Sequence, residues 1–374
     1  MTRINRLVSF VMALNIIAIV IYHKGIIIFQ NIYFPVNSFQ LPLFVFVSGY
    51  LFKEKYVDEV IHYICKKIKS LLVPYFFTNL IFGIICFILR DYNIIKYGED
   101  INSYTLIIRP FIDGHQYGIN VAMWFVTQLF VIQTLYVIIR KLFHKEIALI
   151  ESLCLLFILL ISGCIGVIIV RDGNYVQSVN AFLCRTAFML PFFHMGWMYK
   201  KYDDWINNIS HVRYFLIIIA TQAMCIPFYE DIVIIDNIYL STTIVNYVMA
   251  VNGILLIWRI AKIISPYFEK SRLIEYIGMN TWTVMSYHQF VFLLINIGIY
   301  LMIPYFGIED FDINRFQTYH WYTYKENSVF MIELYVIAGV GLPLAVKYWF
   351  EKQLSQSVIW KNVTVINQAM EKHF

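Results

Sequence analysis

LCLLFILLISGCIGVIIV, residues 153–170, decides the fold class of this chain, because eighteen successive residues carry neither a charge nor a proline. A helix needs about 20 mainly apolar residues to cross a hydrocarbon core about 30 Å thick. The whole chain agrees with this stretch: of 374 residues, 60% are hydrophobic and 14% are charged, and the mean hydropathy is +0.66. Soluble domains average about 45–50% apolar and about 25% charged residues. The sequence therefore predicts an integral membrane protein.

Nine further apolar segments of similar length accompany this stretch. The ten predicted spanning segments cover approximately residues 7–29, 35–52, 71–89, 120–139, 147–170, 179–199, 212–229, 240–261, 276–301 and 328–350. Because a lipid-exposed backbone must satisfy its own hydrogen bonds, we expect these segments to be helices. The predicted fold is an all-α, polytopic transmembrane bundle of about ten spanning helices, in a single domain over residues 1–374. The first segment resembles a signal peptide but lacks a small-residue cleavage site, so we expect an uncleaved helix.

The basic residues lie at the ends of the apolar segments and do not form one tract. If the N-terminus is cytoplasmic, the alternation of ten helices places 21 of the 29 Lys and Arg residues on the cytoplasmic side. Cytoplasmic loops characteristically carry such an excess, so we expect both termini inside the cell. The dispersed net charge of +5 indicates no nucleic-acid partner. The six cysteines form no C-x-x-C pair, and we expect small buried apolar residues and no metal site.

Two stretches outside the predicted helices are long enough to carry a site, and both fall on the outer side in this topology. Residues 90–119 contain His115 among several aromatic residues, and residues 302–327 contain His320 with carboxylates and a run of Tyr and Trp. Aromatic faces suit the apolar faces of sugar rings, and carboxylates accept hydrogen bonds from hydroxyl groups. We therefore consider His115 and His320 as carbohydrate contacts. The alternative is an aromatic belt at the membrane interface.

The inner segment KEKYVDEVIHYICKKIKS, residues 53–70, has a different pattern. Its apolar residues Val57, Ile61, Ile64 and Ile68 recur at helical spacing with charges between them. This pattern predicts an amphipathic helix on the cytoplasmic surface that continues into the third spanning helix.

Ionisable residues inside spanning segments are costly and therefore suggest function. His23 lies 17 residues after Arg6, which is ~26 Å along a helix, and His288 lies 13 residues after Glu275, which is ~20 Å. The two histidines should therefore lie at similar depth in the outer half of the bilayer. A neutral imidazole can take a proton from a hydroxyl group, although a buried histidine can also be purely structural.

Three more ionisable residues fall in predicted helices. Arg185 lies about six residues into its helix, so it either extends outward to the interface or faces a cavity. Glu333 lies at a similar position in the last helix, and we consider it as a partner for Arg185. His194 lies near the cytoplasmic end of its helix, and we expect it to be structural.

Six short motifs follow one another along the chain. They are ALNIIAIVIYHKG with His23, LPLFVFVSGYLFK with Ser48 and Gly49, KKIKSLLVPYF with Pro74, Trp124-Phe125, PFFHMGWMYKK with Gly196, and GMNTWTVMSYH with Asn280 and His288. In this order they resemble membrane-bound acyltransferase family 3, a bacterial family that includes O-acetyltransferases of surface polysaccharides. The last motif of the family reads Gly-x-Asn-Ser/Thr, followed by a histidine ten residues after the glycine, and the match here also looks like the fucose 4-O-acetylase members. The resemblance covers nearly the whole chain.

Two positions depart from the family pattern. The family usually has an arginine eleven residues before the first histidine, where this chain has Met12. Eleven residues bring position 12 to within ~20° of His23 around the helix, so the expected cation is missing from the face of the histidine. The family's cytoplasmic motif also usually has two arginines, where this chain has Lys66 and Lys69 with Lys67 between them. Lysine holds a phosphate as a point charge, without the bidentate geometry of arginine.

The resemblance implies an O-acyltransferase in the bacterial inner membrane. Its acyl donor would be acetyl-CoA in the cytoplasm, with Lys66, Lys67 and Lys69 at the phosphates. Its acceptor would be a carbohydrate hydroxyl of a surface polysaccharide, lipid-linked glycan or exopolysaccharide on the outer side. His23 would act as the general base or carry the acyl group, and His288 or Arg185 would orient the acceptor or stabilise the oxyanion. Trp124 and Asn280, together with His115 and His320, would contact the acceptor.

Two alternatives stay open at this point. The same polar groups would line the path of a transporter that exports a polysaccharide or small metabolite, and the loss of the cation at Met12 is compatible with that function. The chain would otherwise be an inactive relative or a structural partner subunit.

Overall fold

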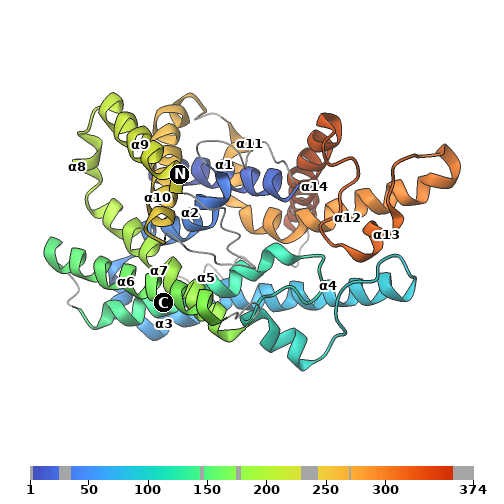
Figure 1. Ribbon diagram of the computed structural model, residues 1–374, viewed down its shortest axis with the longest axis horizontal. Helices are drawn as coiled ribbons and strands as arrows, with labels where there is room; N and C mark the ends of the chain where they lie inside the picture. The colour runs from blue at the N-terminus through green and yellow to red at the C-terminus, as the bar shows by residue number, and fades with distance from the viewer. Residues whose placement is uncertain are drawn as a thin grey trace.

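The computed structural model describes residues 3–24, 35–143, 147–173, 178–228, 243–268 and 271–356 (Figure 1). In these ranges the chain forms α-helices joined by loops and short 3-10 or π-helical turns, without β-strands. The prediction of an all-α fold is therefore confirmed.

Ten helices coincide with the ten predicted segments. They are α1 (Arg3–His23), α2 (Val36–Tyr50), α4 (Val73–Asp91), α5 (Trp124–Lys141), α6 (Leu149–Gly173), α7 (Val179–Lys201), α9 (His211–Cys225), α10 (Thr243–Ile264), α12 (Thr281–Phe306) and α14 (Val329–Gln356). Four shorter helices lie between them: α3 (Val60–Lys67), α8 (Asp203–Asn207), α11 (Arg272–Met279) and α13 (Ile313–Thr318). In the described ranges, eight helical stretches are long and apolar enough to cross a membrane, so the chain is a multi-pass membrane protein.

The two predicted segments outside that set of eight, α2 and α7, lie in the interior of the bundle and pack on each other. A Cβ atom at Gly49 would lie 1.8 Å from the carbonyl oxygen of Phe193, and one at Gly196 would lie 2.0 Å from that of Phe46. Glycine is therefore needed at both positions, because the two backbones touch. Most side chains of both helices are buried, so they meet protein and not lipid. This position explains why α7 tolerates Arg185 and His194.

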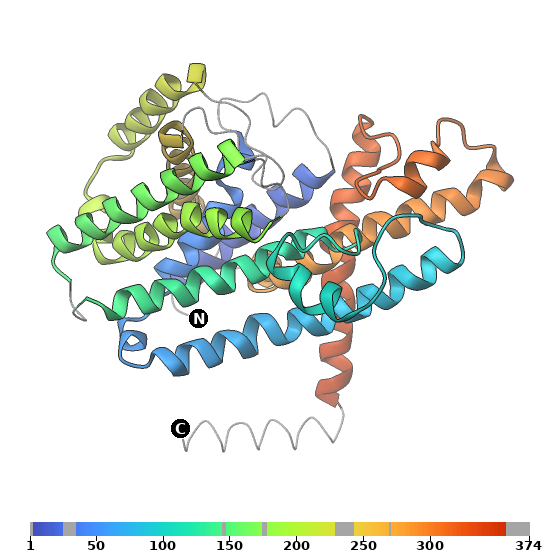
Figure 2. The same cartoon turned by 60° about the horizontal axis from the view of Figure 1, so that its bottom comes forward.

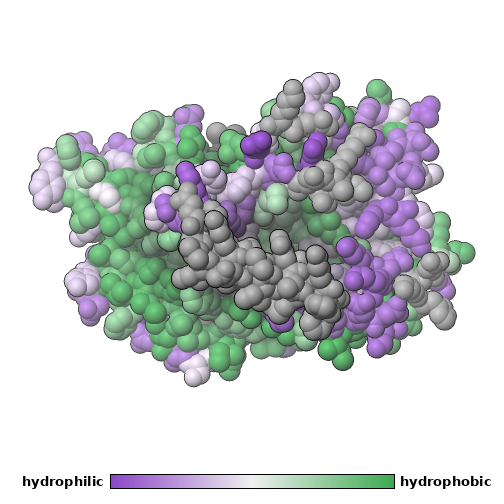
Figure 3. All heavy atoms as spheres, turned by 180° about the vertical axis from the view of Figure 1, so that it is seen from behind, coloured by the Kyte–Doolittle hydropathy of each residue, from purple (hydrophilic) through white to green (hydrophobic). Residues whose placement is uncertain are grey.

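Helix α6 packs one face on α7, where Leu155 and Leu159 are buried, and exposes apolar side chains on its other faces. Ile150, Phe157 and Ile158 are 74%, 64% and 57% exposed. A helix that is apolar all round and still exposed is suited to lipid contact. Figure 3 shows a broad apolar area on the face opposite that of Figure 1, with hydrophilic residues gathered toward one end of the long axis.

Helices α4 and α12 extend together beyond the rest of the bundle (Figure 2). Phe82 of α4 packs on Tyr287 and Phe290 of α12, with ring centres 5.5 and 5.6 Å apart. The two predicted outer stretches meet at this extension, because the backbone nitrogen of Lys96 donates to the carbonyl oxygen of Gln317 at 2.7 Å. A second apolar cluster, built around Tyr117 and Phe316, fills the space between them.

The inner segment 53–70 begins with a 3-10 turn at Glu54–Val57 and is α-helical from Val60, where α3 begins. Helix α3 continues through residues 68–72 into α4 without a break. The predicted continuation into the third spanning helix is therefore confirmed. The expected apolar stripe is divided, since Val57 is buried whereas Ile61 and Ile68 are 79% and 38% exposed. Tyr63 supplies the buried contact of α3.

Candidate active site

A pair of histidines lies where the two apolar clusters meet. His23 is the last residue of α1, and its Nδ1 lies 2.7 Å from Nε2 of His288 on α12. The two rings are nearly parallel, with an angle of 4° between their planes. His288 is fully buried, and its Nδ1 lies 2.8 Å from the carbonyl oxygen of Val284. The two histidines, which the sequence predicts at similar depth, are therefore in direct contact.

The tautomers of the neutral pair follow from these contacts. A carbonyl oxygen only accepts hydrogen bonds, so Nδ1 of His288 carries the proton and donates to Val284. Nε2 of a neutral His288 is then an acceptor, and Nδ1 of His23 must donate to it. Nε2 of His23 is left with a free lone pair. The pair therefore presents one basic nitrogen, which the orientation of the second histidine selects.

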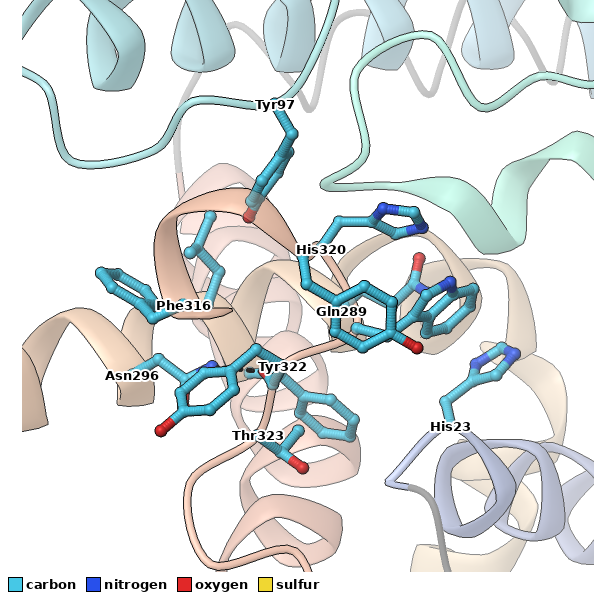
Figure 4. A pocket seen from close by; sticks show the side chains of 12 residues that line it. His23, Tyr97, Gln289, Asn296, Phe316, His320, Tyr322 and Thr323 are labelled. Carbon is cyan, nitrogen blue, oxygen red and sulfur yellow. Dashed lines mark hydrogen bonds between the residues drawn. The ribbon is translucent and has the colours of Figure 1, made fainter. Parts of the chain in front are cut away.

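His23 lines a small pocket with a volume of about 20 Å³, enough for about one water molecule. Gln289 and Asn296 of α12 form part of its wall, and Tyr97 comes from the segment after α4 (Figure 4). The loop 319–323 covers the pocket and includes Trp321, whose ring centre lies 5.1 Å from that of His23. The pocket is thus lined mainly by aromatic and uncharged polar groups.

His115 and His320, the two histidines predicted in the outer stretches, also lie in this region. His320 lines the pocket, and burial lowers the pKa of both residues to about 4. The pKa of His115 is further lowered by neighbouring His320 and Arg185, against the effect of Asp113. The Nε2 atoms of both histidines are buried without a hydrogen-bond partner among the described residues. At neutral pH they are uncharged groups that can bind a hydroxyl.

Asp113 and Arg109 hold the loop that carries His115. Nε and Nη2 of Arg109 donate to the two carboxylate oxygens of Asp113 at 2.8 and 2.9 Å. Asp113 in turn accepts from the backbone nitrogen of His115 at 3.2 Å. A bidentate pair of this kind fixes orientation as well as distance, so His115 is held in place from its own loop.

Arg185 and Trp124 meet beside this loop. The guanidinium of Arg185 lies 5.2 Å from the ring centre of Trp124, and Nη2 donates to the carbonyl oxygen of Ile112 at 2.8 Å. Arg185 is buried, whereas Glu333, its predicted partner, is exposed on α14. Just before Trp124, the backbone nitrogen of Ala122 donates to the side chain of Gln289 at 2.9 Å. The start of α5 is thereby attached to the residue after His288.

Among the predicted acceptor contacts only His320 lines the pocket, while Trp124 and His115 lie on neighbouring segments and Asn280 lies elsewhere. Asn280 occupies the joint between α11 and α12, where its amide donates to the carbonyl oxygen of Tyr276 at 2.8 Å. Its side-chain oxygen accepts a hydrogen bond from Lys347 of α14. These contacts connect three helices at a distance of eight residues from His288.

The three predicted donor lysines lie at the other end of the bundle. Lys66 donates to the hydroxyl of Tyr56 at 3.0 Å, Lys67 lies 5.1 Å from the ring centre of Tyr63, and Lys69 is exposed. Phe52 packs on both tyrosines and also lines a pocket of about 510 Å³. The other residues around this basic pocket are Lys53, Glu54, Trp197, Lys200 and Lys201.

Arg185 and the basic pocket lie at opposite ends of α7. Arg185 near its start and Lys200 at its end are 15 residues apart, or ~22 Å along the helix. Helix α5 also runs between the two regions. It begins at Trp124 beside Arg185, and buried Arg140 near its other end lies 4.8 Å from the ring centre of Trp197, which lines the basic pocket.

Met12 and His194 have structural positions. Met12 is partly buried against the main apolar core, so no cation occupies that place on α1. His194 is fully buried and lies 2.9 Å from the hydroxyl of Tyr136 and 3.0 Å from the carbonyl oxygen of Ser152. This agrees with the structural role expected for it.

Fold and site together define a multi-pass helical membrane protein with a histidine pair at a pocket and a basic pocket toward the opposite end. The family model for the acyltransferase domain of acyltransferase family 3 matches residues 10–350, and the chain therefore belongs to this family. Searches of curated proteins and of solved structures gave no significant match.

Proposed function

We propose that this transmembrane acyltransferase transfers an acetyl group from acetyl-CoA in the cytoplasm to a hydroxyl of a surface or exported carbohydrate. The observation that carries the proposal is the contact between His23 and His288, which leaves a basic nitrogen at a pocket lined by aromatic and neutral polar groups. A general base for an alcohol must lie within hydrogen-bond reach of the hydroxyl and have an unprotonated nitrogen facing it. In the neutral pair, His288 accepts from Nδ1–H of His23 and so leaves Nε2 of His23 unprotonated.

The reaction proceeds in one displacement. Nε2 of His23 takes the proton of the hydroxyl as its oxygen attacks the thioester carbonyl carbon, and the tetrahedral intermediate expels the CoA thiolate, which receives the proton. His288 stabilises the cationic His23 by accepting from its Nδ1–H. We assign Arg185, the buried cation beside Trp124, to orient the acceptor or to stabilise the negative charge of the intermediate.

The residues in and beside the pocket support a carbohydrate as the acceptor. Trp321 and His320 line the pocket, whereas Trp124 and His115 belong to neighbouring segments. The two tryptophans provide aromatic faces, and the two histidines provide uncharged groups with free nitrogen atoms. Sugars combine apolar faces with many hydroxyl groups, so this composition favours them over anionic acceptors. With a volume of about 20 Å³, the pocket must widen to admit a sugar ring.

The basic pocket supports a donor that carries phosphates. Lys53, Lys200 and Lys201 surround it, and Lys66 and Lys67 lie on the neighbouring tyrosines. The distribution of Lys and Arg favours a cytoplasmic position for this end and for both termini, in the inner membrane of a bacterium. We propose that the phosphates of CoA bind among these lysines.

Proteoliposomes test the proposal directly. Vesicles are loaded with a panel of methyl glycosides, and [¹⁴C]acetyl-CoA is added outside. Wild type should label a glycoside inside the vesicles, and His23→Ala should label it about 10²–10⁴-fold more slowly. His211→Ala is the matched control, because His211 is an exposed histidine at the start of α9.

Two results would contradict this mechanism. Equal labelling by wild type and His23→Ala would exclude His23 as the base. Movement of a glycoside across the bilayer without any labelling by wild type would favour a transporter.

A further inference from the structure

Lys24 directly follows His23 and is one of the largest fully buried side chains in the described ranges, with 1% exposure. A buried ammonium group is expensive unless other groups replace its hydration. None of the ion pairs found among the described residues includes Lys24. Its position beside the proposed base, at this cost, indicates a role in function.

The partners of Lys24 all belong to segments distant in sequence. Its Nζ donates to the hydroxyl of Thr323 at 3.0 Å and to the backbone oxygen of Glu326 at 3.4 Å. The ammonium also lies 4.8 Å from the ring centre of Tyr335 on α14. Lys24 therefore connects the end of α1 with the loop that covers the pocket and with the last helix.

The same loop is held from its other side by Asn296 of α12. The amide of Asn296 donates to the backbone oxygen of Tyr322 at 2.8 Å, and its oxygen accepts from the backbone nitrogen of Tyr324 at 3.3 Å and from the hydroxyl of Tyr335. The backbone of residues 322–324 is thus fixed by α12 and α14, while Thr323 is bound by Lys24. In the described ranges, the contact of Lys24 with Thr323 joins α1, which carries the base, to this network.

We propose that Lys24 is a positioning residue for acyl transfer, because its ammonium ties the helix end that carries His23 to the loop that carries the acceptor-binding side chains. Thr323 and His320 line the same pocket as His23, so the contact sets the distance between the base and the acceptor hydroxyl. A displacement of about 1 Å between reacting groups can cost about 10²-fold in rate. The inference rests on the proposed function, since it assumes that His23 is the base.

The charge of Lys24 provides a readout that a merely structural role would not give. Burial lowers the pKa of Lys24 to about 8, while the carboxylate of Glu326 raises it. Above that pH the side chain becomes neutral, and its bonds to Thr323 and to the backbone weaken. The titratable or charged groups of the packed elements are Glu326, Arg315, Tyr324, Tyr335, His288 and His23.

The experiment compares Lys24→Met, Lys24→Arg and Thr323→Val with wild type, using [¹⁴C]acetyl-CoA and the methyl glycoside that wild type labels best. Lys24→Met should lower kcat/KM for the glycoside about 10–100-fold and leave KM for acetyl-CoA unchanged. Lys24→Arg should restore most of the rate and keep it above pH 8, where wild type declines, because arginine stays protonated. Lys325→Met is the control, since Lys325 lies in the same loop but is exposed.

Thr323→Val protects the test against a Lys24 variant that does not fold, because it removes the acceptor of the contact and leaves the lysine in place. It should also lower kcat/KM for the glycoside without changing KM for acetyl-CoA. A folded Lys24→Met with wild-type kcat/KM would overturn the proposal, as would a Lys24→Arg variant no faster than Lys24→Met. If His23→Ala were as active as wild type, the proposed function itself would fail, whatever the Lys24 variants show.

Discussion

Replacing His288 by glutamine and by leucine separates two contributions of this residue to acyl transfer. In the structure, Nε2 of His288 accepts from Nδ1 of His23 at 2.7 Å. Glutamine can still accept this hydrogen bond through its side-chain oxygen, whereas leucine cannot. Both variants are unable to take up a proton.

The size of the effect follows from the positive charge that His23 would acquire as the proposed base. A hydrogen bond to a charged group contributes about 1.5–3 kcal/mol, and each 1.36 kcal/mol corresponds to a tenfold change in rate. We therefore expect His288→Leu to be slower than wild type by about 10–150-fold in kcat. His288→Gln should stay within about tenfold of wild type, because the acceptor and hence the tautomer of His23 are preserved.

The assay is the initial rate of [¹⁴C]acetyl transfer to a methyl glycoside, measured from pH 5 to 9 for each purified variant. A His288→Leu variant with wild-type kcat would refute the reasoning, since His23 would then need no partner. Equal slowing of the glutamine and leucine variants would show that His288 has to accept the proton itself.

Three further predictions concern the packing, the donor site and the pH dependence of stability. Gly49→Ala should lower the free energy of unfolding by about 3 kcal/mol and reduce the melting temperature, because its Cβ would lie 1.8 Å from a backbone oxygen of Phe193. The control Gly298→Ala should leave the melting temperature unchanged, because its Cβ would meet nothing within 4 Å, and equal melting temperatures of the two variants would contradict the contact between α2 and α7. Lys200→Gln should raise KM for acetyl-CoA about 3–10-fold and reduce the salt dependence of KM. The control Arg213→Gln, an exposed change at the start of α9, should leave both quantities unchanged. An unaltered KM in Lys200→Gln would exclude Lys200 as a phosphate contact. Burial lowers the pKa of His320 to about 4 in the folded chain, against about 6.5 when unfolded, so the folding stability of the protein is not reduced by this residue above pH 6.5 and declines as the pH falls toward 4. Thermal melts should show a shallower decline in His320→Gln, and parallel pH curves for the two proteins would disagree with a buried neutral imidazole.

Much of the helical architecture was predictable, because segments of about 20 apolar residues have few other solutions in lipid. Counting residues from the flanking charges also placed His23 and His288 at similar depth, and the structure brings them into contact. Composition could not show that α2 and α7 are interior helices, since this depends on the close approach at Gly49 and Gly196.

The roles of Lys24, Asn296 and Gln289 were not predictable from the sequence for a related reason. Lys24 follows an apolar run and has the pattern of a charge at the membrane interface, yet its partners Thr323 and Glu326 lie about 300 residues away. Asn296 and Gln289 have the pattern of ordinary interhelical hydrogen bonds. The same limit explains Glu333, which matched Arg185 in depth but lies exposed on α14.

The length of α7 determines how far a donor would have to reach between the two ends of the bundle. Arg185 and Lys200 are ~22 Å apart along this helix. If the donor binds by its phosphates at the Lys200 end as proposed, it would need a thin arm of about that length to reach the Arg185 end. Pantetheine is such an arm, and it would let the thioester enter from one membrane face while the sugar enters from the other. Donor and acceptor would then be bound simultaneously, and steady-state kinetics would show the intersecting lines of a ternary complex.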